Sequence, residues 1–263
     1  MKHLKVLWAY RYFIISTIFT EFKTRFVRSR LGGIWMVLHP LAQVAIYALV
    51  LSAVLSAKLP GIESHYAYAI YLMAGILSWN LFSEVFIRCL TMFVDNGNLL
   101  KKMSFPKIAL PIIIIGSALV NNVLLFVAII FVFGLLGHTM TIAIVYLPIV
   151  VFITLLLALG LGLMLGVLNV FIRDIGQMMP IILQFWFWLT PIVYIASIIP
   201  EKYSVWMKLN PMYGIATAYQ SILVYGKFPL FSTLLYPIFL ALLALGTALW
   251  IYYKANEEMA DVL

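Results

Sequence analysis

The pattern of apolar and charged positions divides this chain into long uncharged runs separated by short charged segments. The longest run reaches from Ile108 to Ile172 without a single Asp, Glu, Lys or Arg. About 20 apolar residues cross the hydrocarbon core of a bilayer, whereas a helix at the surface of a soluble protein needs one polar face. The run is therefore typical of membrane-spanning helices, and it is long enough for two.

The uncharged runs predict an all-α membrane protein with six transmembrane helices. Few residues separate the third run from the fourth, so we expect these two to form a helical hairpin with a very short loop. The spans are expected at Ile34–Ala57, Tyr66–Phe93, Ala109–Leu136, Ile142–Leu168, Pro180–Ile199 and Leu230–Tyr253.

The distribution of basic residues orients the chain in the membrane. Lys and Arg are concentrated before the first span, in the loops after the second and fourth spans, and beyond the last span. Because cytoplasmic loops carry the excess of these residues, both termini are predicted to be cytoplasmic. The chain then divides into a cytoplasmic N-terminus with an amphipathic helix (1–30), a six-helix transmembrane domain (31–254) and a cytoplasmic tail (255–263).

Composition narrows the function classes. The chain has 263 residues, of which 65% are hydrophobic and 10% charged, with one cysteine, Cys89. It has no GxxxxGK[ST] phosphate loop and no HExxH motif, and its histidines are scattered. We therefore expect neither an enzyme nor a bound metal or cofactor, so the energy for uphill work would come from a partner or an ion gradient. The net charge of +8 indicates membrane orientation and anionic lipid contact rather than nucleic-acid binding.

The stretch from Tyr10 to Arg30 predicts a helix lying in the membrane interface, because an apolar stripe runs opposite several cations. Two interpretations of its basic end stay open. It is an orientation signal with an anchor, or Arg25, Arg28 and Arg30 bind a phosphate-bearing lipid head group. The apolar stripe consists of Ile15, Ile18, Phe19, Phe22 and Phe26. The polar side consists of Arg11, Glu21, Lys23, Thr24, Arg25 and Arg28.

Two cytoplasmic loops carry candidate docking residues for a partner. The loop Asp95–Lys107 contains a helix-sized segment with Leu99, Leu100, Lys101 and Lys102, and the loop Asn169–Met179 has Arg173 and Asp174 at its centre. Solvated connectors would look the same by spacing alone, so both interpretations stay open.

Glu84 and Arg88 lie within the second span at i, i+4, with the acid first, which is the favourable order for a helix pair. Charges in a span often mark a transport pathway. A neutralised pair near the cytoplasmic end, with Arg88 reaching toward the interface, is the alternative.

The fifth span is dense in aromatic residues, which either anchor it at the membrane interface or line a conduit. Trp and Tyr combine an apolar ring face with a polar tip, and this suits a sliding sugar polymer. The candidate conduit residues are Phe185, Trp186, Phe187, Trp188 and Tyr194.

The segment Ile199–Pro229 is too polar and too interrupted by Pro and Gly to be one ordinary span. We expect short helices that dip back into the outer face of the membrane, where irregular backbone needs cover from protein or a water-filled cavity. The candidate outer-gate residues are Tyr203, Trp206, Asn210, Pro211 and Tyr213.

Several sequence blocks follow one another in an order typical of a known family. After the amphipathic stretch come Arg30-Leu-Gly-Gly-Ile-Trp35, His39-Pro40-Leu41, Asn169-Val-Phe-Ile-Arg-Asp-Ile-Gly-Gln177, Phe187-Trp188-Leu-Thr-Pro-Ile-Val-Tyr194 and Asn210-Pro-Met-Tyr213. The chain thus resembles, over essentially its whole length, the membrane subunit of ABC-2-type polysaccharide exporters, the O-antigen, capsule and teichoic-acid permease group. The Arg-Asp-Ile and Trp-Leu-Thr-Pro blocks are the most specific.

The resemblance implies a homodimeric permease in the bacterial inner membrane, with two separate ATP-binding subunits that would hold ATP and Mg. The cargo would be a glycan on a polyprenyl diphosphate, with O-antigen favoured and teichoic acid or capsule as alternatives. The two cytoplasmic loops and the N-terminal helix would be docking surfaces, re-entrant helices between spans five and six would form the outer gate, and aromatics of 185–194 would line the pore.

Two other function classes stay open. One is an ABC-2 exporter of a small hydrophobic drug or lipid, since apolar cargo also favours aromatic residues. The other is a membrane-embedded enzyme such as a polyprenol glycosyltransferase, which needs acidic residues at the interface. Asp95 and Asp174 are the candidates in the cytoplasmic loops between spans, and they form no motif.

Overall fold

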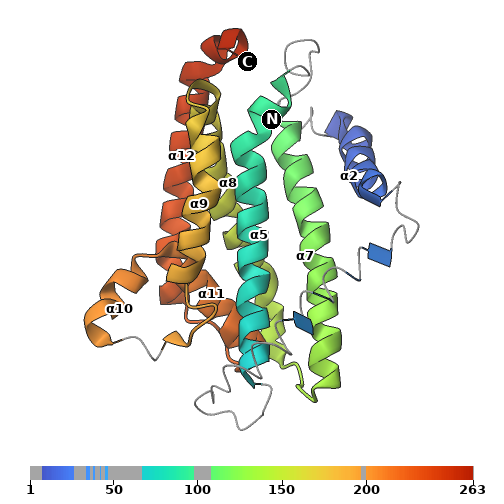
Figure 1. Cartoon of the computed structure of the whole chain (residues 1–263), viewed down its shortest axis with the longest axis vertical. Coiled ribbons are helices and arrows are strands. Elements are labelled where there is room, and N and C mark those ends of the chain that lie inside the picture. The colour runs from blue at the N-terminus through green and yellow to red at the C-terminus, as the bar shows by residue number, and fades with distance from the viewer. Residues whose placement is uncertain are drawn as a thin grey trace.

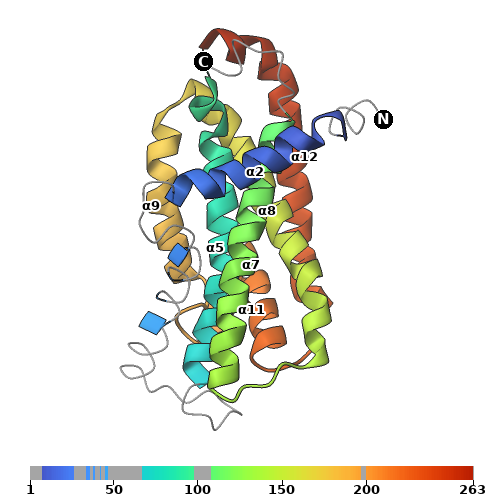
Figure 2. The ribbon, with the colours of Figure 1, turned by 90° about the vertical axis from the view of Figure 1, so that its right-hand side faces the viewer.

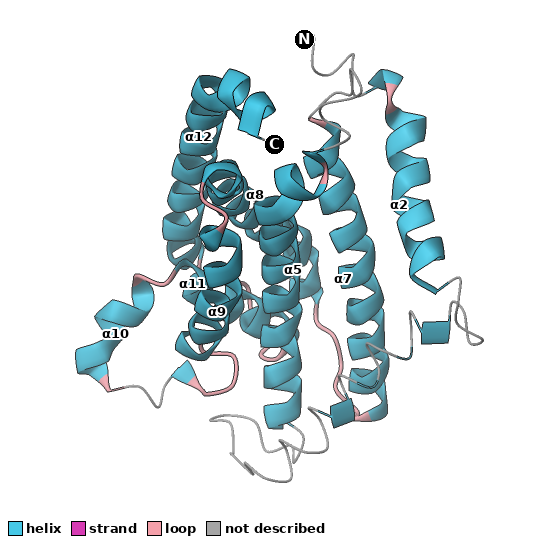
Figure 3. Cartoon of the chain, turned by 45° about the horizontal axis from the view of Figure 1, so that its top comes forward, coloured by secondary structure: helices cyan, strands magenta, loops and turns pink. Residues whose placement is uncertain are grey.

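The computed structural model of the chain describes residues 8–26, 34, 35, 38, 42, 45, 46, 67–97, 108–196 and 200–262. Over these residues every regular element is a helix (Figure 1, Figure 3), which confirms the predicted all-α class for this part of the chain. The elements are α2 (Arg11–Phe26), α5 (Ala67–Asp95), α7 (Ala109–Leu135), the 3₁₀ helix η3 (Ile142–Tyr146), α8 (Leu147–Phe171), α9 (Asp174–Leu189), α10 (Glu201–Lys208), α11 (Pro211–Leu223) and α12 (Phe231–Val262).

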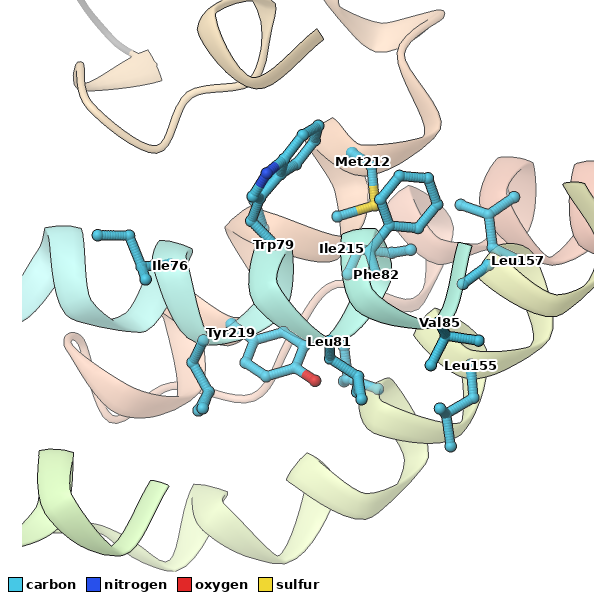
Figure 4. Close-up of a cluster of buried hydrophobic side chains, with 14 of the residues drawn as sticks. Ile76, Trp79, Leu81, Phe82, Val85, Leu155, Leu157, Met212, Ile215 and Tyr219 are labelled. Atoms are coloured by element: carbon cyan, nitrogen blue, oxygen red, sulfur yellow. The ribbon is translucent and has the colours of Figure 1, made fainter. Parts of the chain in front are cut away.

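Helix α5 is the centre of the bundle, because α7, α8, α9 and α11 all pack against it. In its most apolar window 78% of the residues are buried within the chain, against 28% in α12. Figure 4 shows part of this core, where side chains of α5, α8 and α11 meet, among them Phe82, Leu157 and Tyr219. The second predicted span is therefore an internal helix rather than a lipid-facing one.

Glycines on α8 let it approach two neighbours closely. A Cβ on Gly162 would lie 2.7 Å from Cβ of Cys89 in α5, and one on Gly166 would overlap the carbonyl of the same residue. A Cβ on Gly160 would lie 3.0 Å from backbone atoms of α12. Helices in lipid gain little from apolar burial against each other, so small residues that allow tight contact stabilise their packing.

The connection between α7 and α8 is short, as predicted. Gly137, with φ of +72°, turns the chain after α7 in a conformation that favours glycine. The ring Nε2 of His138 donates to the carbonyl of Leu223, 2.8 Å away in α11. Both α7 and α8 pack mainly on other helices, α7 on α5 and α2 and α8 on α12 and α5, so the central α5 holds the two spans together.

Four elements are long and apolar enough to cross a membrane: α5, α7, η3 with α8, and α12 as far as Ala255. They correspond to the second, third, fourth and sixth predicted spans, and the chain is a multi-pass membrane protein. The first predicted span, 34–57, lies largely outside the described residues.

The fifth predicted span differs from the helix observed. Helix α9 begins at Asp174 rather than Pro180 and ends at Leu189 rather than Ile199. Its 16 residues rise about 24 Å, short of the roughly 30 Å hydrocarbon core. The helix stops early because Thr190 is extended, as a residue preceding a proline tends to be.

Between α9 and α12 the chain forms the short helices α10 and α11, in the segment where the sequence predicts short helices. Asn210 caps α11, since its side chain accepts from the backbone N–H of Met212 at 3.0 Å, and Pro211 follows at the first helical position. Helix α12 continues to Val262, so the segment predicted as a tail is helical at least that far.

Candidate functional site

The predicted aromatic lining lies on two opposite sides of α9. Phe185 and Trp188 are 69% and 59% exposed, whereas Trp186 and Phe187 are partly buried against the core. Phe187 packs edge-on against Trp79 of α5, with ring centroids 5.5 Å apart. Residues on an α-helix advance about 100° each, so four consecutive aromatics cannot all face one pore.

The inward aromatics of α9 continue into α5. Trp186 packs edge-on against Phe82 at 5.2 Å and against Trp79 at 6.3 Å between centroids. The sequence analysis did not single out Trp79. A Trp in one predicted span and a cluster of aromatic residues in another could have indicated that the two helices pack together. A layer of Trp79, Phe82, Trp186 and Phe187 therefore joins the two helices.

Asn210 holds the end of α9 to the start of α11 through four hydrogen bonds. Its Oδ1 accepts from Trp186 Nε1 at 2.7 Å and from the N–H of Met212 at 3.0 Å. Its Nδ2 donates to the carbonyl of Leu189 at 3.2 Å and to Oγ1 of Thr190 at 3.0 Å. We call these five residues the amide cluster, and within it the hydrogen-bonding capacity of the Asn210 amide is filled.

The segment that follows α9 is fastened to α5 and α11. The hydroxyl of Tyr71 and Nε2 of Gln220 donate to the carbonyl of Pro191 at 3.2 and 2.8 Å. The hydroxyl of Tyr71 also lies 3.3 Å from the carbonyl of Tyr194, and that of Tyr68 donates to the carbonyl of Val193. An irregular backbone in an apolar environment needs such partners.

The predicted outer-gate residues divide between fixed and exposed positions. Asn210 and Pro211 anchor the start of α11, and Pro211 is buried. Tyr213 is partly buried, while Tyr203 and Trp206 on α10 are 54% and 72% exposed. Figure 1 shows α10 standing away from the bundle, so its aromatic side chains are free to contact lipid, solvent or another chain.

At the other end of the bundle, α2 packs across α7 (Figure 2). The sequence predicts Ile15 and Phe19 on the apolar face and Glu21 on the polar face. The structure confirms part of this pattern and shifts the rest. Phe22 of the predicted stripe is buried and Ile18 packs inward. Ile15 and Phe19, however, are 50% and 71% exposed, and Ile14 is buried in their place. Packing on α7 selects the inward face here, and the outer face stays apolar.

Glu21 joins the charged pair predicted within the second span through its contact with Arg88. Arg88 Nη2 donates to Oε2 of Glu21 at 2.9 Å, and its Nη1 lies 3.7 Å from Oε1 of Glu84. Ser117 of α7 donates to Glu21 at 2.7 Å, and Asn121 of α7 donates to Glu84 at 2.5 Å. We call these five residues the charged junction. The predicted i, i+4 pair of Glu84 and Arg88 is present. The shorter contact of Arg88, however, is with Glu21 of α2, a helix that the sequence analysis treated separately.

The turn with Arg173 and Asp174 lies at the start of α9, where both residues are exposed. Asn169, which the sequence did not single out, fastens this turn to α5. Its Oδ1 accepts from the N–H of Gly176 at 2.8 Å, and its Nδ2 donates to the carbonyl of Leu90 at 3.2 Å.

Several predicted site residues lie outside the described part of the chain. They are Arg28, Arg30, Leu99, Leu100, Lys101 and Lys102, and for Arg25 only the place in α2 is described. Within the described residues, His, Cys, Asp and Glu form no group of three that could hold a metal ion.

Comparison with known proteins shows which family this chain resembles. Residues 14–224 match the model of the ABC-2 type transporter family. The chain is 29% identical over 263 residues to the O-antigen export system permease protein RfbA of Myxococcus xanthus, covering 99% of each chain. It is 25% identical to a protein of that name from Klebsiella pneumoniae over 92% of each chain. It is 23% identical to the polysialic acid transport protein KpsM of Escherichia coli, over 91% of this chain and 92% of the other. With most of its length matched by the family model and four membrane-spanning helices in its fold, the chain belongs to the ABC-2 type transporter family.

Proposed function

We propose that this chain is the membrane permease subunit of an ABC exporter that moves a polysaccharide across the bacterial inner membrane. The observation that carries the proposal is similarity over more than nine-tenths of the chain to permeases named for O-antigen and polysialic acid. These two glycans differ, so the shared property is a long polar polymer. We infer a lipid-linked glycan, with the polyprenyl diphosphate at the cytoplasmic face.

The energy source is proposed to be a separate ATP-binding subunit. Two copies of the permease would pair with two such subunits, which would hold ATP and Mg. The exposed turn at Arg173 and Asp174 supports one docking surface, because Asn169 ties it to α5 and a push there would reach the centre of the bundle. The loop 99–102 would form the second docking surface.

The proposed topology has six spans with both termini in the cytoplasm. Segment 34–57 and α9 would add two spans to the four described ones. The segment after α9 would extend that short helix toward the outer face. Helices α10 and α11 would then form the outer gate as re-entrant elements. The hydrogen bonds that fasten residues 190–194 support this, since buried irregular backbone requires such partners.

The aromatic residues are proposed to guide the glycan. Between α5 and α9, the glycan would contact the ring faces of Trp186 and Phe187. At a surface shared with the second copy of the chain, it would contact Phe185, Trp188 and Tyr194. At the cytoplasmic end Arg25, Arg28 and Arg30 would bind the diphosphate through their guanidinium groups, which suit phosphate oxygens.

The test is a strain that lacks this chain. Lipid-linked glycan should accumulate inside the cell and surface glycan should disappear, and the wild-type chain should restore export. A strain whose partner ATPase carries a substitution that abolishes hydrolysis is the matched control and should show the same accumulation. Normal surface glycan without accumulation would overturn the proposal, and altered drug or lipid efflux in its place would indicate the small-molecule alternative.

A further inference from the structure

Helix α2 contacts the bundle in two chemically different ways. Toward α7 its contacts are apolar, apart from the hydrogen bond from Ser117 to Glu21: Ile14 clusters with Ala109 and Ile113, and Ile18 lies over Gly116. Toward α5 the contact is ionic, from Glu21 to Arg88 at 2.9 Å. Apolar contact over small residues is non-directional and tolerates sliding. A charge-assisted hydrogen bond has a defined length and direction, so it fixes the position of α2.

The charged junction is buried enough for its pairing to matter. The side chains of Arg88, Glu84 and Glu21 are 26%, 26% and 29% exposed. Screening is weak in such a partly buried, apolar site, and an ion without its counterion is unfavourable there. Glu84 stays hydrogen-bonded to Asn121 and Glu21 to Ser117, so each carboxylate is held from α7 while it meets Arg88.

Arg88 also lies on the helix that contacts most of the bundle. Helix α5 packs against α7, α8, α9 and α11, and α9 and α11 carry the amide cluster. A displacement of α2 that pulls on Arg88 therefore acts on the helix that touches Trp186 and Phe187 directly and the turn at residue 173 through Asn169.

We propose that Arg88 is a positioning residue that locks α2 to α5 through Glu21, so that α2 and the bundle move as one unit during export. The part of this inference that concerns export rests on the proposed function, whereas the docking of α2 does not. Neither Glu21 nor Arg88 is assigned a contact with the glycan.

The docking of α2 can be measured by a disulfide between positions 18 and 116. A Cβ added to Gly116 would lie 3.4 Å from Cγ1 of Ile18 and would touch its terminal methyl, which a cysteine at position 18 lacks. The Cβ of residue 18 is bonded to that Cγ1 position and lies beyond 4 Å from the added Cβ, so a small approach of the two helices brings the pair within the roughly 3.5–4.5 Å separation of a disulfide. The reporter is Ile18→Cys with Gly116→Cys in a Cys89→Ala background, because Cys89 is the single native cysteine.

In this reporter we expect Glu21→Gln and Arg88→Gln each to lower the initial rate of crosslinking about tenfold, the equivalent of roughly 1.4 kcal/mol. The double variant should match either single variant, because both remove the same contact. Arg88→Lys should keep most of the rate. Lys23→Gln, an exposed change on α2, is the matched control and should have no effect. Unchanged crosslinking in folded Glu21→Gln and Arg88→Gln protein would overturn the proposal.

Rescue by the disulfide separates positioning from a chemical role. In the complex with its ATPase, Glu21→Gln should raise the ATP consumed per glycan exported, and oxidising the 18–116 disulfide should restore the wild-type ratio. If oxidation restores nothing although the disulfide forms, Glu21 acts by contact and the positioning role is wrong. If Arg88→Gln does not fold, Glu21→Gln carries the test, because it leaves Arg88 paired with Glu84. A wild-type complex that exports no polysaccharide would refute the proposed function, while the crosslinking rates would still decide the docking of α2.

Discussion

The charged junction and the amide cluster both join helices that are distant in the sequence, but they do so with different chemistry. The junction uses one guanidinium between two carboxylates, with neutral donors from α7. The amide cluster uses neutral groups throughout, centred on Asn210. Ionic partners in an apolar site are costly to separate. Neutral hydrogen bonds exchange readily for bonds to water or a hydroxyl.

This difference in chemistry indicates which end of the helix bundle is suited to opening during transport. We expect the neutral amide cluster to release Trp186 when a hydroxyl of a sugar replaces its bond to Asn210. The charged junction has no equivalent substitute in an apolar surrounding, so it is suited to keeping α2 in place. We therefore expect the moving part of the cycle at α9, α10 and α11 and the rigid part at α2, α5 and α7.

Loss of Arg88 should have the largest effect on stability. Arg88→Met removes the guanidinium that pairs with the carboxylates of Glu21 and Glu84, and removing one partner of a buried pair costs about 3–5 kcal/mol. Because the Arg88 side chain is 26% exposed, we expect a smaller cost of roughly 2–4 kcal/mol. Thermal unfolding in detergent measures it. Arg88→Lys should recover most of the loss, and a variant as stable as the wild type would contradict the ionic account.

Loss of Asn210 should come second. Asn210→Ala removes the cap of α11 and leaves the indole N–H of Trp186 without its acceptor, at a cost of about 1–3 kcal/mol. The same unfolding measurement applies, together with leak of a small sugar into vesicles that contain the permease alone. Raised leak would support an outer gate held by Asn210. A stability loss without leak would restrict Asn210 to a structural role.

A smaller effect is expected from Trp186→Phe, which keeps the ring against α5 and removes only the hydrogen bond to Asn210. One neutral hydrogen bond contributes about 0.5–1.5 kcal/mol. Measured in the Asn210→Ala background, the change should have almost no further effect, because the two residues share the bond. Full additivity of the two substitutions would show that their contact contributes nothing.

The smallest effect on stability is expected from Trp188→Ala, since Trp188 is 59% exposed on the outer side of α9. Surface substitutions usually change stability by less than about 0.5 kcal/mol. Surface glycan should nevertheless fall if Trp188 serves the glycan or a second copy of the chain. Phe239→Ala on α12, 64% exposed, is the matched control and should leave both stability and export unchanged.

The sequence predicted most of the spans because lipid imposes a simple rule on them. A helix that crosses the hydrocarbon core must be long and predominantly apolar, so α5, α7, α8 and α12 are visible as apolar runs in the sequence. The short helices between α9 and α12 were also predictable, from Pro, Gly and polar residues in the segment. The length of α9 was not, because one aromatic run continues through the break at Thr190 and Pro191.

Within the candidate site the sequence pointed to some of the interacting residues but not to their partners. Glu84 and Arg88 were recognised as a pair because four residues bring them together on any helix. Glu21 was placed on the polar face of an isolated helix, and the packing on α7 turned it inward. Asn210 was predicted to be a gate residue, and its bond to Trp186 depends on how α9 and α11 meet.

By itself, the sequence determined that the described part of this chain is helical and where most of its spans lie, since these depend on local hydrophobicity and spacing. Only the tertiary structure decided that α5 is the internal helix, that the aromatics of α9 face two ways, and that Arg88 reaches Glu21. Those outcomes depend on contacts between segments separated by many residues. In a bilayer, an apolar side chain is equally stable against a neighbouring helix or against the lipid tails. Hydrophobicity alone therefore does not show which face of a helix meets its neighbour.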